Sequence, residues 1–129
     1  MASRFHAQCT VSSAFPIAEY EYPAVTPALL RELVSRIRKA GKPLKIVLFG
    51  SRARGEERPG SDIDLLIVEH SRRPRWERSP KYYHVAGDVY PCVDIVVWTP
   101  AEIAEWAAVP NHFVTEALRE GKVLYERSR

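Results

Sequence analysis

Cysteine is scarce in this sequence, and long apolar runs are absent from it. Only two cysteines occur among the 129 residues, too few and too ill-spaced for a disulfide framework or a zinc site. No apolar run approaches the roughly 20 residues that a membrane helix needs, and the first residues lack the apolar stretch of a secretory signal peptide. We therefore expect a cytoplasmic protein with reduced thiols, and neither a disulfide scaffold nor a membrane protein.

The composition also differs from that of a disordered chain. Hydrophobic residues make up 46% of the sequence and charged residues 27%, which is the balance of one small folded domain. A chain of this length buries roughly two-thirds of its unfolded surface. Domains with so modest a core often complete themselves in a homo- or hetero-oligomer.

Positive charge gathers in residues 70–84, which we call the basic segment. It holds five Lys and Arg residues and one Glu, whereas the whole chain carries a net charge of only +3. A nucleic-acid binder usually spreads its charge along a face or a helix, so the pattern favours an anionic substrate or partner over nucleic acid without excluding the latter. The basic segment is either a solvated loop or a contact in which Trp76, Tyr82 and Tyr83 stack bases.

The N-terminal residues differ from the rest of the chain. Residues 1–25 show no sustained periodicity and are expected to form an arm, whereas residues 26–129 alternate helical and strand patterns and are expected to form one domain. Thr26-Pro27 is typical of a helix start, and apolar residues then recur at helical spacing as far as Gly41. The domain is therefore predicted to begin with a helix.

Strand-like runs and short helices are predicted to follow. The expected strands are 44–49, 63–68, 93–98 and 122–125, each bounded by turn or cap residues. The expected helices are a turn opened by Gly50-Ser51, a short helix over 79–87, a helix from the Thr99 capping box to about 107, and a last helix from a cap at Asn111 to Gly121. We predict an α+β fold, a small mixed β-sheet of three or four strands flanked by helices.

Three aspartates are placed to share one face of this sheet. Asp62 and Asp64 alternate with Ile63 at the head of a predicted strand, so both point to one side. Two carboxylates about 7 Å apart on one strand repel each other unless a cation lies between them, and oxygen ligands favour Mg²⁺. Asp94 can face the same side from the next strand, and three such carboxylates could hold two metal ions. The alternative is a turn acid, a capping acid and a loop-edge acid.

A glycine and a serine after the first predicted strand suit a phosphate group. The turn that Gly50-Ser51 opens offers free backbone N–H groups and a positive helix end. The glycine lets the backbone approach a ligand closely, and the serine hydroxyl can donate to a phosphate oxygen. Arg52 or Arg54 could add charge-assisted hydrogen bonds, and the sequence does not choose between them. An anion site beside a carboxylate cluster indicates phosphoryl or nucleotidyl transfer.

These residues together resemble a known signature. Gly50-Ser51, ten further residues and Asp62-Ile63-Asp64 match the pattern G-S-x10-D-x-D of nucleotidyltransferases. The surrounding FGSRARG…SDIDLLI resembles the minimal nucleotidyltransferases of the DNA polymerase β superfamily, whose third acid falls on Asp94. The resemblance covers about residues 26–126. The arm and the basic segment depart from it.

The resemblance implies a polymerase-β-like nucleotidyltransferase fold and a Mg²⁺-dependent transfer of a nucleoside monophosphate to an acceptor hydroxyl. It assigns Asp62 and Asp64 to both of two Mg²⁺ ions. It assigns Asp94 to the ion near the acceptor, whose hydroxyl this residue would help to deprotonate. Gly50, Ser51 and one of the two arginines would hold the triphosphate, and the expected donor is ATP or another NTP.

The resemblance also implies a partner. Single-domain members are often antitoxins that adenylylate a tyrosine of a HEPN-type toxin, so the implied acceptor is a protein. One alternative is a non-catalytic antitoxin module that only binds its partner, against which the intact acids argue. Another is a small-molecule adenylyltransferase of the aminoglycoside type. Those enzymes usually bring an additional helical domain, for which 129 residues leave little room.

Overall fold

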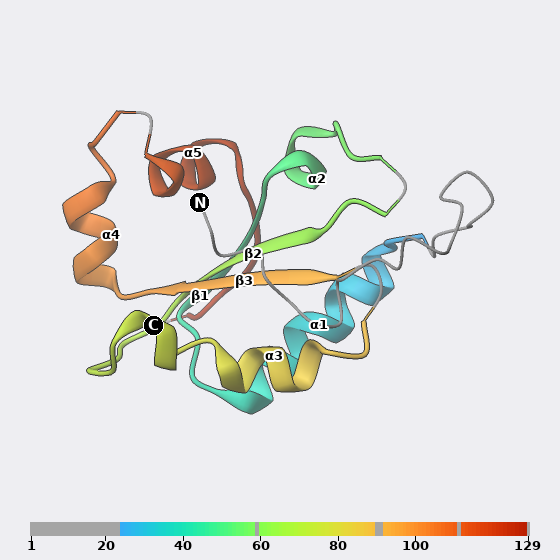
Figure 1. Cartoon of the computed structure of the whole chain (residues 1–129), viewed down its shortest axis with the longest axis horizontal. Coiled ribbons are helices and arrows are strands. Elements are labelled where there is room, and N and C mark those ends of the chain that lie inside the picture. The colour runs from blue at the N-terminus through green and yellow to red at the C-terminus, as the bar shows by residue number, and fades with distance from the viewer. Residues whose placement is uncertain (1–23, 59, 90–91, 111, 129) are drawn as a thin grey trace.

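A four-stranded mixed sheet runs through the centre of the structure, a computed structural model that describes residues 24–58, 60–89, 92–110 and 112–128 (Figure 1). The strands are β1 (Lys45–Phe49), β2 (Ile63–Val68), β3 (Val93–Trp98) and β4 (Lys122–Glu126), in the order β3-β2-β1-β4. β1 pairs antiparallel with β2 and β4, whereas β2 and β3 run parallel. This mixed sheet with its helices confirms the predicted α+β fold.

Helices cover both faces of the sheet. They are α1 (Pro27–Ala40), α2 (Ser51–Arg54), α3 (Pro80–Ala86), α4 (Pro100–Trp106) and α5 (Phe113–Glu120), with a 3-10 turn, η3, at Arg75–Glu77. In Figure 1, α1 and α3 lie on one side of the sheet and α4 and α5 on the other. The crossover between the parallel strands β2 and β3 contains η3 and α3. The basic segment therefore forms most of this crossover.

Strand alternation divides the core into two clusters. Ile63 and Leu65 of β2 and Ile95 of β3 are buried in the cluster that contains residues of α1 and α3. Leu66 and Trp98 pack on the other face, with residues of α5. Because successive side chains of a strand point to opposite faces, the aspartates of β2 and β3 lie on the face that carries α5.

The helix start signals hold with one exception. Thr26 caps α1 through its side-chain oxygen, and Thr99 forms the expected capping box at the start of α4. The cap of α5 is His112, whose Nδ1 accepts a hydrogen bond from a backbone N–H. The prediction of Asn111 as this cap is therefore wrong, and Asn111 itself lies outside the described residues. A ring nitrogen takes the place of the expected amide oxygen.

Three further expectations concern the N-terminal arm, the cysteines and membrane-spanning helices. The expected arm, residues 1–25, lies outside the described residues up to position 23, so its boundary with the domain stays a prediction. Cys92 is disulfide-bonded, so the expectation of a reduced thiol there is wrong. Across the ranges that the structure describes, every helix is too short or too polar to cross a membrane.

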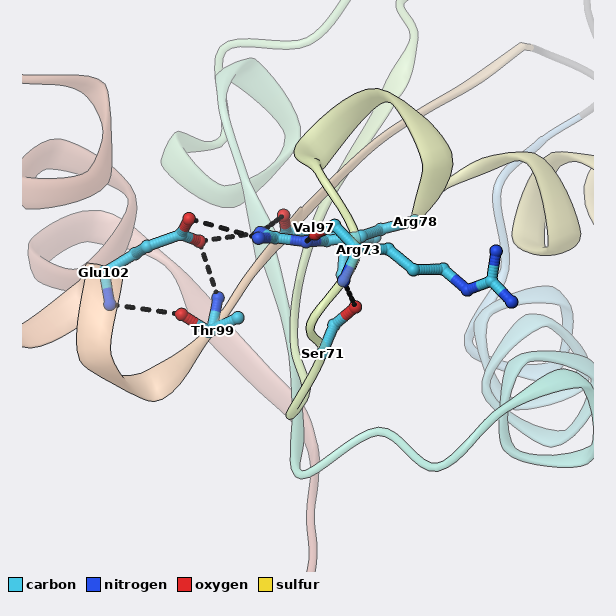
Figure 2. A network of polar contacts seen from close by, with 6 residues as sticks. All are labelled: Ser71, Arg73, Arg78, Val97, Thr99 and Glu102. Atoms are coloured by element: carbon cyan, nitrogen blue, oxygen red, sulfur yellow. Dashed lines mark hydrogen bonds and ion pairs between the residues drawn. The ribbon is translucent and has the colours of Figure 1, made fainter.

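The basic segment is fastened to the fold by Arg78, which is buried. Its guanidinium faces the Glu102 carboxylate with two contacts, 2.7 Å from Nη1 to Oε1 and 3.2 Å from Nη2 to Oε2 (Figure 2). It also donates to the carbonyl oxygens of Arg73, at 2.8 Å, and Val97, at 3.3 Å. The hydrogen bonds from Arg78 lower the pKa of Glu102 to about 2. This ion pair links the crossover to α4.

Other side chains of the basic segment also have partners within the chain. The Arg75 guanidinium lies over the Trp98 ring, 4.2 Å from its centroid. Lys81 pairs with the buried Glu69 at 2.9 Å, and the hydroxyl of the fully buried Tyr82 donates to the same carboxylate. This stretch is therefore a solvated loop only in part, since Arg72, Arg73 and Trp76 are exposed. The Tyr82 ring is also enclosed and cannot stack on a base.

Candidate active site

The carboxylates of Asp64 and Asp94 come from directly opposite positions in the sheet. The two residues are partners in the parallel pairing of β2 and β3, and neighbouring strands lie about 4.8 Å apart. Only 6% of Asp64 and 4% of Asp94 is exposed. Two carboxylates so close and so shielded repel each other unless a cation joins them. The structure thus brings two of the three predicted acids together.

Asp62 stands immediately ahead of β2 and is half-buried. Strand alternation places it on the same face as Asp64, two residues further on. Arg52 holds the approach to this strand, because its Nε and Nη2 donate to the Ser61 carbonyl oxygen at 3.0 and 2.9 Å. Arg52 therefore fixes the loop that leads to Asp62 and directs two of its donors at backbone.

Arg54 is the other predicted phosphate ligand, and it lines the cavity beside the acids. Its Nε lies 2.7 Å from Glu56 Oε1 and its Nη1 3.6 Å from Glu120 Oε1. The hydrogen bond to Glu56 is the main cause that raises the pKa of the guanidinium. These are exposed ion pairs, which are generally weak, so an incoming phosphate could displace them. Of the two arginines, Arg54 is the one placed to meet a ligand.

The cavity has a volume of about 510 Å³, within the usual range of about 300–1,000 Å³ for small-ligand sites. Its walls include Gly50, Ser51, Arg54 and Asp64 together with Phe113, Glu116 and Glu120 of α5. The α5 residues were not predicted as part of the site. They reach it only because α5 packs on the sheet, and no local pattern in the sequence signals that.

Position 50 requires a glycine for two reasons, its backbone conformation and the closeness of a neighbouring side chain. Its φ is +76°, a conformation that residues with a side chain rarely adopt. A Cβ at this position would lie 2.3 Å from Asp64 Oδ2. The glycine therefore lets the turn between β1 and α2 close directly over the carboxylate of β2.

Replacing Gly50 by alanine is expected to displace the Asp64 carboxylate and to abolish Mg²⁺-dependent ATP binding. The matched control is Gly55→Ala, because Gly55 has a similar φ of +74° and nothing within 4 Å of an added Cβ. Gly55→Ala carries a backbone penalty of about 1–2 kcal/mol in the left-handed region, and Gly50→Ala a larger one, because its ψ of −156° lies in a region that only glycine readily adopts. Both penalties are measurable as a lower melting temperature. Equal ATP affinities for the two variants would contradict the role given to Gly50.

Tyr83 of α3 reaches the same carboxylate pair. Its hydroxyl oxygen lies 3.1 Å from Asp94 Oδ1 and 3.1 Å from the Ile95 carbonyl oxygen, and it accepts a hydrogen bond from the Ile95 N–H at 2.7 Å. The sequence suggested base stacking for this ring. The structure instead directs its hydroxyl to the third acid, a contact that the spacing of residues 83 and 94 does not reveal.

The three aspartates were predicted to bind metal. Within the described part of the chain, no three His, Cys, Asp or Glu side chains converge closely enough to form a metal site on their own. The pair Asp64 and Asp94 nevertheless suits Mg²⁺, because this ion is usually held by one or two carboxylates together with substrate phosphates. The donor set therefore fits a metal that binds together with a nucleotide.

Comparison with known proteins identifies the family of this chain. A family model described as a nucleotidyltransferase domain matches residues 30–124. The fold is similar to that of "a putative nucleotidyltransferase from Sulfolobus solfataricus", with a TM-score of 0.56 and 22% identity over 78% of this chain and 80% of that one. A crystal structure of a "toxin-antitoxin with AMP-PNP" gives a TM-score of 0.48 and 20% identity over 77% and 74%. No curated protein matches the chain.

Proposed function

Because this chain belongs to the nucleotidyltransferase domain family, we propose that it is an enzyme that transfers AMP from ATP to an acceptor hydroxyl. The observation that carries this proposal is that Asp64, whose carboxylate lies against the Gly50-Ser51 turn, is paired across the sheet with the buried Asp94. Asp64 and the groups suited to a phosphate therefore line one cavity. A metal–triphosphate complex needs both at once.

Gly50, Ser51 and Arg54 hold the triphosphate in this proposal. The glycine allows close approach of the backbone, and the serine hydroxyl donates to a phosphate oxygen. Arg54 gives up its exposed contacts with carboxylates for phosphate oxygens, which it can bind with two parallel hydrogen bonds. Arg52 keeps its hydrogen bonds to the Ser61 carbonyl and positions Asp62 indirectly.

Asp62, Asp64 and Asp94 hold two Mg²⁺ ions in this proposal. When bound, these ions would neutralise the charge that builds up on the transferred phosphate and on the leaving pyrophosphate. Asp94 accepts the proton of the acceptor hydroxyl, because it lies on the edge strand β3, one strand further than Asp64 from β1 and the Gly50-Ser51 turn. Attack on the α-phosphate then proceeds in line with the departing pyrophosphate.

We further propose that the acceptor is a hydroxyl of a partner protein, a tyrosine of a HEPN-type toxin, and that the chain acts as an antitoxin. The resemblance of the sequence to single-domain members supports this step. The donor base, adenine, rests on the same resemblance.

The proposal is tested with ATP labelled at either end. The protein, Mg²⁺ and a lysate of its source cells are incubated with ATP that carries the label on the α- or the γ-phosphate. Transfer of AMP predicts label on a protein band from the α-labelled donor alone, because the γ-phosphate leaves with pyrophosphate. Label from the γ-labelled donor alone would indicate phosphoryl transfer, because the α-phosphate then leaves with ADP, and α-label on a small molecule would support the small-molecule adenylyltransferase. No transfer to any acceptor would support the non-catalytic module.

ATP is expected to raise the melting temperature of the protein only when Mg²⁺ is present. The metal joins the carboxylates to the phosphates, so the acids repel an ATP that lacks it. At 100 times its dissociation constant, Mg²⁺-ATP would stabilise the folded state by about 2.7 kcal/mol. Thermal unfolding with ATP in EDTA, with Mg²⁺ alone and with both separates the contributions. Equal stabilisation by ATP with and without Mg²⁺ would argue against the carboxylate assignment.

A further inference from the structure

We propose that Tyr83 is a positioning residue of this site, and that its hydroxyl holds the Asp94 carboxylate in the orientation in which it binds metal. The inference rests on the proposed function, because it takes Asp94 to be a metal ligand. It also gives the crossover between β2 and β3 a part in the chemistry. Tyr83 belongs to the basic segment, within that crossover.

The position of Asp94 explains why it needs such a partner. β3 is the outermost strand of the sheet on the side of the aspartates, next to β2. Asp64 has a strand on each side and the Gly50 backbone against its carboxylate. Asp94 has β2 on one side only, so its support on the other side has to come from outside the sheet.

Tyr83 provides that support from across the edge of the sheet. Its ring packs with the core cluster on the face covered by α1 and α3, the lower side of the sheet in Figure 1. Its hydroxyl reaches the edge of β3, where it accepts from the Ile95 N–H at 2.7 Å and lies 3.1 Å from Asp94 Oδ1. The side chain thus connects one face of the sheet to a carboxylate on the other.

Among the described residues, two acceptors lie within reach of the hydroxyl proton. The Ile95 carbonyl oxygen and Asp94 Oδ1 both lie 3.1 Å from the Tyr83 oxygen. A hydroxyl has a single proton to donate, and an ionised carboxylate is the stronger acceptor of the two. Donation to Asp94 fixes the orientation of its carboxylate. Outer partners of this kind orient metal ligands throughout metalloproteins.

Tyr83 itself is held firmly. The preceding residue, Tyr82, is fully buried and bonded to Glu69, and Lys81 pairs with the same carboxylate. Arg78 ties the start of the crossover to Glu102. These contacts fix α3 on the sheet, so the reach of the Tyr83 hydroxyl is set by the fold and not by a mobile loop.

The test compares Mn²⁺ binding by the full chain with and without this hydroxyl. Mn²⁺ is titrated in the presence of saturating α,β-methylene-ATP, which cannot transfer AMP, and free Mn²⁺ is followed by electron paramagnetic resonance. Tyr83→Phe is expected to weaken Mn²⁺ binding about 10-fold, the lower end of the effect of removing such an outer partner. The phenylalanine keeps the ring in the core, so the variant is expected to fold.

Tyr125→Phe is the matched control, because it removes a tyrosine hydroxyl from β4, the strand at the opposite edge of the sheet. It should leave the Mn²⁺ affinity unchanged. The second control is the pair of variants Asp94→Asn and Asp94→Asn with Tyr83→Phe. If Tyr83 acts through Asp94, removing its hydroxyl has no further effect once that carboxylate is gone.

Two outcomes overturn the inference and one overturns its premise. Unchanged Mn²⁺ affinity in Tyr83→Phe, or the same loss with and without the Asp94 carboxylate, would leave Tyr83 as a structural support of the β3 edge. If Asp64→Asn binds Mn²⁺ as tightly as the wild type does, the proposed function fails, and the inference fails with it. If Asp64→Asn weakens Mn²⁺ binding and Tyr83→Phe does not, only the inference is rejected.

Discussion

Replacing Asp62 and Asp64 together by asparagine is expected to slow nucleotidyl transfer by at least about 10³-fold. The metal ions that these carboxylates hold supply several kcal/mol of charge stabilisation, and each 1.36 kcal/mol corresponds to a factor of ten in rate. In EDTA, the melting temperature should equal or exceed that of the wild type, because an amide at position 64 no longer repels Asp94. Transfer of label from α-labelled ATP and thermal unfolding give the two readouts.

Asp88→Asn is the control for this pair of substitutions. Asp88 is the only other aspartate of the chain besides Asp62, Asp64 and Asp94. Its carboxylate is 73% exposed and pairs with Arg36 at 2.7 Å. The control should keep both the transfer rate and the dependence on Mg²⁺. Mg²⁺-dependent transfer by the double variant would reject the assignment of the acids.

Most of the fold could be predicted from local patterns. The α1 start at Thr26 and the α4 capping box at Thr99 each depend on interactions within one turn of helix, which the sequence displays directly. The strand order β3-β2-β1-β4 could not be predicted, because pairing depends on contacts between distant residues. The cap of α5 was misplaced by one residue since a histidine ring nitrogen accepts the bond that an amide oxygen was expected to accept.

The candidate site was predictable where its spacing is local. The separation of Gly50 from Asp62 and Asp64 can be read along the chain, and alternation places the two acids on one face. The choice between the two arginines could not be made from the sequence. It depends on whether a side chain meets backbone, as Arg52 does at Ser61, or faces the cavity.

In the basic segment, the sequence displays the charge but not the contacts that the charged side chains make. Its charge is visible in the sequence and suggested a contact with an anionic partner, but charge alone does not reveal what a side chain faces. Arg78 is buried on Glu102, Arg75 lies over an indole ring, and Lys81 neutralises a buried glutamate. Much of this positive charge therefore stabilises the crossover between β2 and β3, and a partner would meet only what is left exposed.

Replacing Arg78 by methionine is expected to destabilise the fold by about 3–5 kcal/mol, the usual cost of removing one member of a buried ion pair. The substitution leaves the Glu102 carboxylate, 25% exposed, and the carbonyl oxygens of Arg73 and Val97 without the donor that now serves them. Arg78→Lys should recover only part of the loss, because an ammonium cannot reproduce the two-pronged contact of Figure 2. Urea unfolding at neutral pH measures the difference.

The same pair sets an acid dependence that the variant should lose. The pKa of Glu102 is lowered from 4.5 to about 2 by its hydrogen bonds, first of all from Arg78. A depressed folded-state pKa contributes stability that is complete above the unfolded value and is lost as the pH falls through the folded one. Wild-type stability should therefore decline between about pH 4.5 and 2, and this decline should be smaller in Arg78→Met.

Arg73→Met removes an exposed arginine that pairs with Glu77 at 3.5 Å and should change stability by less than about 1 kcal/mol. Similar losses in both variants would mean that the Arg78 contacts do not hold the crossover.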